Sequence, residues 1–204
     1  EFVRQGHRIE RLATIFETEG GTGKVRTLIW EGAWKLITPH EPLTFPDGTA
    51  DAWNAIRPLI GYGPESMYVA YNRFYPPDLA HYESRNASPD RSHNETYDSL
   101  VITGVLGLCA YLFVFGSVFY YGYRWLGWIG SRRTTWLFAG LWVGGALAGG
   151  LGAILIGEPK YLGVAIPAGA IGLALILYVM LYALFRHGIE LPAFLLLGGL
   201  IGTA

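Results

Sequence analysis

The sequence contains little cysteine and, over long stretches, no charge. Cys109 is the single cysteine among 204 residues, so the chain can form no internal disulfide. Residues 99–204 hold 5 of the 15 Lys and Arg residues and 2 of the 16 Asp and Glu residues. The net charge of −1 indicates neither a nucleic-acid-binding protein nor an acidic tail. The uneven distribution of charge divides the chain into two unlike halves.

Several catalytic motifs are absent as well. The sequence has no HExxH motif for a zinc protease and no GxSxG motif for a serine hydrolase. Gly23-Lys24 lacks the spacing of a phosphate-binding loop. His93-x-Glu95 matches part of the zinc deaminase pattern, but that pattern also needs a pair of cysteines. The sequence therefore predicts no metal site and no cofactor.

Long apolar runs fill the second half. About 20 apolar residues suffice to cross the hydrocarbon core of a bilayer. We therefore predict an all-α, polytopic integral membrane protein, with transmembrane helices at about 99–123, 134–157 and 161–185 and a truncated fourth run at 190–204. Because that run is too short to span and the chain begins at Glu1 rather than Met, we expect a fragment of a larger helical bundle.

Residues inside the spans indicate packing rather than transport. Six glycines give small-xxx-small spacing, which lets helices approach closely in lipid: Gly140, Gly144, Gly145, Gly149, Gly150 and Gly152. Pro167 predicts a kink in the third span, and we expect Cys109 to be a buried apolar side chain. No ionisable residue lies mid-membrane, which argues against an ion pathway in these helices.

Basic residues predict the orientation. Arg124, Arg132 and Arg133 lie between the first two spans, and Arg186 follows the third. The positive-inside rule places these loops in the cytoplasm and residues 1–98 on the extracytoplasmic side. Aromatic residues crowd the same ends, as interfacial belts do: Tyr120, Tyr121, Tyr123, Trp125, Trp128 and Trp136.

The first half predicts helices lying on the outer face. Residues 1–23 are expected to form an interfacial amphipathic helix and a Gly-rich break, and residues 24–98 an extracytoplasmic helical loop region carrying the site. Within this region we expect a helix over 25–37, a tight turn at Gly61–Pro64 and an interfacial helix over 65–75. Arg26 would lie in the first turn of its helix, where a cation is disfavoured. An anionic ligand would serve as its partner, although a solvated arginine is an equal alternative.

The segment DRSHNETYD, residues 90–98, is the main candidate for chemistry. Ser92 and Glu95 have the spacing of a capping box, which would place His93 and Asn94 in the first helical turn. The positive end of the helix favours a neutral imidazole that can accept a proton, and it would also attract a phosphate. The alternative is that His93 and Asn94 only cap the helix or meet lipid headgroups.

The order of four motifs resembles the O-antigen ligase and polymerase family: Val25-Arg26-x-x-Ile29-Trp30, Pro58-Leu-Ile-Gly-Tyr-Gly-Pro64, Ser92-His93-Asn94 and Thr103-Gly-Val-Leu-Gly107. The resemblance covers roughly residues 24–125. It implies a bacterial inner-membrane glycosyltransferase that uses sugars carried on undecaprenyl pyrophosphate, without metal or nucleotide. It also implies a catalytic histidine, matching His93, and a pyrophosphate-binding arginine, matching Arg26.

Further arginines around the pyrophosphate are implied as well, and the candidates are Arg91, Arg73 and Arg57, with Asn94 beside them. The expected partners are a lipid-linked oligosaccharide donor, a glycan or lipid acceptor, and membrane lipids. The sequence does not separate a ligase from a polymerase. A second class stays open, in which the chain is a non-catalytic membrane subunit that packs against other membrane subunits in a larger complex.

Overall fold

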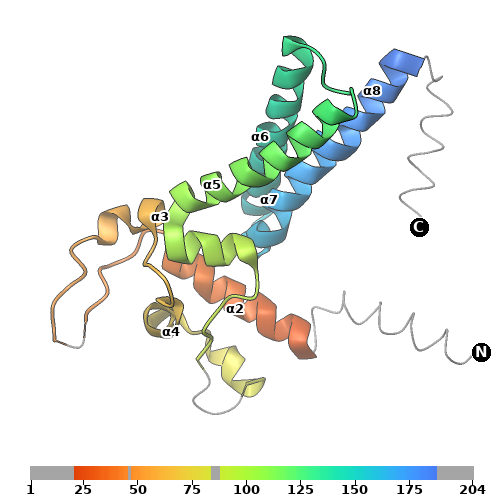
Figure 1. The fold of residues 1–204 in the computed structure, drawn as a ribbon. Helices are drawn as coiled ribbons and strands as arrows, with labels where there is room; N and C mark the ends of the chain where they lie inside the picture. The colour runs from red at the N-terminus through yellow and green to blue at the C-terminus, as the bar shows by residue number, and fades with distance from the viewer. Residues whose placement is uncertain (1–20, 46, 84–87, 188–204) are drawn as a thin grey trace, which may run out of the picture. The chain divides into compact units, whose positions relative to one another are not determined.

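The residues that the structure describes form helices and loops, with an isolated β-bridge between Thr44 and Ala50 (Figure 1). The computed structural model describes three stretches: residues 21–45, 47–83 and 88–187. The all-α prediction is confirmed over these residues. Residues 1–20, which include the amphipathic helix predicted within 1–23, and the fourth apolar run at 190–204 lie outside the described residues.

Three of the described helices are long and apolar enough to cross a membrane. They are α5 (Glu95–Trp125), α6 (Arg132–Leu155) and a composite helix over Pro159–Phe185. The composite helix consists of four consecutive elements: η4 (Pro159–Tyr161), α7 (Leu162–Ala170), the π-helical η5 (Ile171–Leu177) and α8 (Tyr178–His187). Each of the three coincides closely with a predicted span, because uninterrupted apolar length is a strong sequence signal.

The chain divides into two compact units. The first contains Glu1–Tyr111 and Gly157–Gly163, and the second contains Leu112–Ile156 and Val164–Ala204. All the residues predicted for the functional site belong to the first unit. The second unit contains most of the apolar helical length.

In the first unit, α2 (Gly21–Ile37) is the longest of the described helices before α5. It confirms the helix predicted over 25–37, and it begins earlier, so Gly21–Gly23 are helical rather than part of a break. Its buried side consists of Thr27, Leu28, Ile29, Ala33 and Leu36. This side gives the first unit its core.

Short elements follow α2: η1 (Asn54–Ile56), α3 (Arg57–Ile60), α4 (Met67–Ala70), η2 (Tyr71–Phe74) and η3 (Pro77–His81). The helix predicted over 65–75 is thus present as two short pieces, α4 and η2. Tyr71 is fully buried, and its ring lies so close to Gly32 of α2 that a side chain at Gly32 would collide with it. Glycine at position 32 therefore allows η2 to pack directly on α2.

The first predicted span is not one continuous helix. α5 breaks at Gly104, whose φ of 68° and ψ of −166° are open essentially to glycine alone (Figure 1). At such a break, the carbonyl groups of the preceding turn lose the backbone N–H donors that a continuous helix would supply. The backbone N–H of Tyr62 donates to the Val101 carbonyl at 2.7 Å. The N–H of Gly63 donates to the Ile102 carbonyl at 3.0 Å, so the turn after α3 replaces the lost donors.

A second glycine, Gly61, packs against the backbone of α5 at this break. Gly61 has a φ of 72° and a ψ of −174°, which confirms the tight turn predicted there. A Cβ atom on Gly61 would collide with the backbone of Ile102, and a Cβ on Gly104 would collide with the backbone of Leu59. The two segments therefore meet backbone to backbone at a pair of glycines, here called the glycine joint (Gly61 and Gly104).

Small residues also bring helices together in the second unit. A Cβ atom on Gly145 of α6 would collide with the Gly169 backbone of α7, and one on Gly149 would collide with the Ala165 backbone. The close approach predicted from the glycine spacing is confirmed at these two positions. Gly140 has no neighbour within 4 Å of such a Cβ among the described residues.

Aromatic side chains form much of the core of the second unit. Phe138, Trp142 and Tyr178 are buried, and the rings of Tyr123 and Tyr178 stack with centroids 5.7 Å apart. Three residues of the predicted interfacial belt, Tyr120, Tyr123 and Trp128, are partly buried and pack against this core. Tyr121, Trp125 and Trp136 are exposed.

The prediction for Cys109 is wrong. Its side chain is exposed on α5 and does not fill the core. A thiol is apolar enough for an exposed position on an apolar helix as well as for a core, so the residue type alone does not predict whether Cys109 is buried.

Candidate functional site

The polar loop before α5 is held by one buried carboxylate. Asp98 accepts hydrogen bonds from the backbone N–H of Ser92 at 2.8 Å and from the Ser92 hydroxyl at 2.7 Å. Ser92 and Asp98 are both buried. Arg91 forms ion pairs at 3.3 Å with Asp98 and, on the exposed side, with Glu95. A buried carboxylate needs such partners, and here they fix the loop in one arrangement.

The cap of α5 differs from the predicted capping box. Asn94, not Ser92, caps the helix: its Oδ1 accepts the N–H groups of Thr96 and Tyr97 at 3.1 and 3.3 Å. The predicted role of Glu95 is also absent, because its carboxylate pairs with Arg91. Asparagine is as good a cap as serine, and the buried Asp98 competes for the Ser92 hydroxyl. The helix consequently begins at Glu95, and His93 and Asn94 precede it instead of lying in its first turn.

His93 has an unusual backbone conformation. Its φ is +55°, in the left-handed region that few non-glycine residues adopt. Its side chain is exposed, and no hydrogen bond holds the imidazole within the described part of the chain. Strain of this kind occurs preferentially at functional sites. The loop thus presents an imidazole whose nitrogens can reach a ligand.

Trp30 joins α2 to this loop. Its indole N–H donates to the Ser92 carbonyl at 2.9 Å, and its ring stacks on that of Tyr97 with centroids 6.4 Å apart. Arg26 lies one turn earlier on the same face of α2, because residues four apart are neighbours on a helix surface. Arg26 is exposed and has no ion-pair partner among the described residues. α2 therefore presents the Arg26 guanidinium one turn before Trp30, on the helix face that contacts the His93 loop.

The start of α5 is also tied to the segment that leads into α7. The Tyr97 hydroxyl donates to the Pro159 carbonyl at 2.7 Å, and the Thr96 hydroxyl donates to the Gly163 carbonyl at 3.1 Å. Pro167 has no N–H to give that carbonyl, so Thr96 provides the donor that proline removes from α7. The segment from Pro159 to Gly163 thus contacts the first turn of α5, directly after the His93 loop.

The two other candidate arginines lie elsewhere in the first unit. Arg57 and Arg73 both line a cavity of about 560 Å³. Arg57 pairs with Asp51 at 2.8 Å and Arg73 with Glu41 at 3.1 Å. Their cavity does not include His93. The structure thus groups Arg57 with Arg73, and groups Arg91 and Asn94 with His93.

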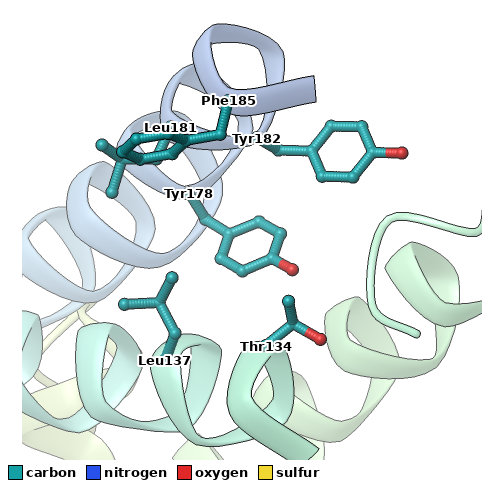
Figure 2. A pocket seen from close by; sticks show the side chains of 6 residues that line it. All are labelled: Thr134, Leu137, Tyr178, Leu181, Tyr182 and Phe185. Atoms are coloured by element: carbon teal, nitrogen blue, oxygen red, sulfur yellow. The ribbon is translucent and has the colours of Figure 1, made fainter. Parts of the chain in front are cut away.

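The second unit contains a cavity of about 490 Å³ between α6 and α8 (Figure 2). Its lining consists of apolar and hydroxyl side chains from these helices: Thr134, Leu137, Tyr178, Leu181, Tyr182 and Phe185. A lining without ionisable carboxylates, histidines or cations offers no acid–base pair. We therefore place the candidate site at the His93 loop.

Two residues of the site escaped the sequence prediction. Asp98 holds the loop in place through its hydrogen bonds to Ser92. Its only signal in the sequence is the position of a carboxylate at the start of an otherwise apolar helix. Trp30 belongs to the first motif of the resemblance, but its contact with Ser92, 62 residues away, has no local pattern in the sequence. No group of three or more His, Cys, Asp and Glu side chains gathers to hold a metal ion within the residues that the structure describes.

The function must be inferred from these contacts. No protein-family model, no curated protein and no solved structure matches this chain.

Proposed function

We propose that this chain belongs to a bacterial inner-membrane glycosyltransferase of the O-antigen ligase type. The enzyme would transfer a glycan from an undecaprenyl-pyrophosphate carrier to an acceptor hydroxyl. The observation that carries this proposal is the contact of Trp30 with Ser92 at 2.9 Å, because it joins the arginine-bearing helix to the histidine loop. The glycine joint adds support, since it brings two further motifs of the resemblance into contact.

The proposed reaction balances without a cofactor. The acceptor oxygen forms a bond to the anomeric carbon of the lipid-linked sugar, and the bond from that carbon to the pyrophosphate oxygen breaks. The imidazole of His93 takes the proton of the acceptor hydroxyl as a general base. Arg26 stabilises the negative charge that develops on the departing undecaprenyl pyrophosphate through charge-assisted hydrogen bonds. Arg91 and Asn94 act through the loop, because their side chains already hold Glu95, Asp98 and the start of α5.

Substitution of Arg26 tests the donor site. Arg26→Lys keeps the charge but loses the planar pair of donors, so we expect transfer from the pyrophosphate donor to fall about tenfold, the effect of one charge-assisted hydrogen bond. Arg26→Ala should fall further. The assay is glycan transfer by the purified full-length protein, with Lys35→Ala as the control, because Lys35 is an exposed cation on α2 that pairs with Glu31. Parental activity in both Arg26 variants would remove Arg26 from the site.

The proposed reaction requires the His93 loop on the extracytoplasmic side, which cysteine labelling can test. In a Cys109→Ala background, an impermeant thiol reagent should label Ala52→Cys in intact cells and should not label Gly130→Cys. Both positions are exposed in the structure. Membrane permeabilisation should make both reactive, which controls for accessibility. Labelling with the reverse pattern would contradict the orientation and the external site together.

A second candidate function is that of a non-catalytic membrane subunit. The observation in its favour is a row of glycines on α6, Gly140, Gly144 and Gly152, that have no neighbour within 4 Å among the described residues. Such a row suits the close approach of another helix. Two experiments distinguish these functions. Accumulation of lipid-linked glycan in a deletion strain supports the enzyme. Purification of the native protein as a stable complex with unrelated membrane proteins, together with normal glycan in the deletion strain, supports the subunit.

A further inference from the structure

A polar cavity in the first unit plays no part in the proposed transfer step. Its volume of about 560 Å³ is within the roughly 300–1,000 Å³ of small-molecule sites. It is formed by the loop after α2, by α3 and the glycine turn, and by α4 and η2. The side chains that matter for its chemistry are Phe45, Asp51, Arg57, Tyr62, Val69 and Arg73.

One wall of the cavity is a rigid ion pair. Arg57 donates from Nε and Nη2 to the two oxygens of Asp51, at 2.8 and 3.0 Å, and from Nη1 to the Gly61 carbonyl at 3.1 Å. The hydrogen bond from Arg57 is the main cause that lowers the pKa of the buried Asp51 carboxyl. The guanidinium also lies over the ring of Tyr62, 5.2 Å from its centroid. Partial burial raises the pKa of Tyr62 to about 12, so its hydroxyl stays neutral.

A second, more exposed ion pair contributes to the lining. Arg73 donates to the Glu41 carboxylate at 3.1 Å and, through Nη1, to the carbonyls of Glu41 and Pro42 at 3.3 and 3.0 Å. This pair joins η2 to the loop after α2. Phe45 and Val69 expose apolar surface beside it.

Free hydrogen-bonding capacity remains on both arginines. A guanidinium has five N–H donors, and the bonds given above use three of them on Arg57. The three hydrogen bonds of Arg73 to Glu41 and Pro42 likewise leave it N–H donors without an acceptor among the described residues. The carboxylate oxygens retain lone pairs that can accept further bonds. The cavity therefore offers donors and acceptors together, beside exposed apolar surface.

The charges decide which ligand fits. Two arginines and two carboxylates cancel, so these four groups give the cavity no net charge. An anion such as pyrophosphate would gain little from these groups, because the carboxylates of Asp51 and Glu41 lie beside the arginines that it would contact and would repel it. A neutral ligand with many hydroxyl groups meets no such repulsion. Its hydroxyls can accept from the arginines and donate to the carboxylates, while its C–H faces lie against the ring of Phe45.

We propose that this cavity binds an uncharged sugar residue of the glycan that the protein handles. This inference deepens the proposed function and rests on it for the identity of the glycan. Arg57 and Arg73, which the sequence offered as pyrophosphate ligands, then act as sugar-binding residues that are separate from the His93 loop.

Blocking the cavity tests the inference. Val69→Trp adds a large ring to the lining without removing a hydrogen bond, because Val69 is an exposed residue of α4. Tyr68→Trp is the matched control, since Tyr68 is its exposed neighbour outside the lining. The full-length protein in nanodiscs is titrated with maltotriose or with N,N′,N″-triacetylchitotriose, both neutral, and binding is followed by saturation-transfer NMR. Inorganic pyrophosphate is then added as a competitor. We expect a neutral trisaccharide to bind and Val69→Trp to weaken it at least about tenfold, because a filled pocket excludes its ligand.

Two further variants separate this inference from the proposed function. Phe45→Ala should also weaken trisaccharide binding, and His93→Asn should leave it unchanged. If glycan transfer fails but the trisaccharide binds and Val69→Trp abolishes binding, the sugar site stands and the transferase proposal falls. The sugar site is overturned if neither trisaccharide binds the folded protein, if Val69→Trp and Tyr68→Trp behave alike, or if pyrophosphate displaces the sugar from this cavity.

Discussion

Gly104→Ala is expected to lower the free energy of unfolding by about 3 kcal/mol or more, because both the backbone conformation and the packing at position 104 require glycine. Its φ of 68° and ψ of −166° are strained for any L side chain. A Cβ atom would also meet the backbone of Leu59 and Ile60, which cannot move aside as a flexible side chain could. The measurement is the thermal unfolding of the purified protein in detergent, followed by fluorescence.

The same joint provides an internal test. Gly61→Ala should cost a similar amount, and the double variant Gly61→Ala/Gly104→Ala should cost less than the sum, because both changes open one contact. Gly122→Ala in α5 is the control, since a Cβ there meets nothing within 4 Å among the described residues, and alanine favours the helix. An unfolding temperature of Gly104→Ala equal to that of the parent would contradict the glycine joint.

The glycine joint also marks the limit of what the sequence could predict. The apolar run from Ser99 to Tyr123 correctly predicts helical structure that is long and apolar enough to cross a membrane, because hydrophobic length is a local property. The break at Gly104 has no local signal, since glycines are common in membrane helices that remain straight. The structure reveals it through Tyr62 and Gly63, which supply the hydrogen bonds that the broken helix loses.

The candidate site shows the same division between local and distant causes. The sequence alone predicts the polar cluster at the start of α5, because a dense polar segment beside an uncharged run can be recognised without knowledge of the fold. Its internal arrangement could not be found, because Ser92 has two competing partners. The buried Asp98 takes the serine hydroxyl and leaves the cap to Asn94. Arg57 and Arg73 are candidates from the sequence because the resemblance implies further arginines around the pyrophosphate. In the structure each pairs with a carboxylate that the sequence does not reveal.

The enzyme and the structural interpretation of His93 predict opposite results for one substitution. His93→Asn should fold and insert normally, because asparagine adopts the left-handed conformation at φ +55° more readily than histidine does. Asparagine cannot take up a proton at neutral pH. If His93 is the general base, transfer should therefore fall roughly 10²–10⁴-fold while the protein stays folded.

The control is His81→Asn, which changes another exposed histidine of the first unit, in η3, away from the loop before α5. Expression, membrane insertion, unfolding temperature and glycan transfer are measured together for both variants. Normal transfer by a well-inserted His93→Asn protein would assign His93 to loop structure alone. It would leave Arg26 and the Trp30 contact as features of a membrane subunit rather than of an enzyme.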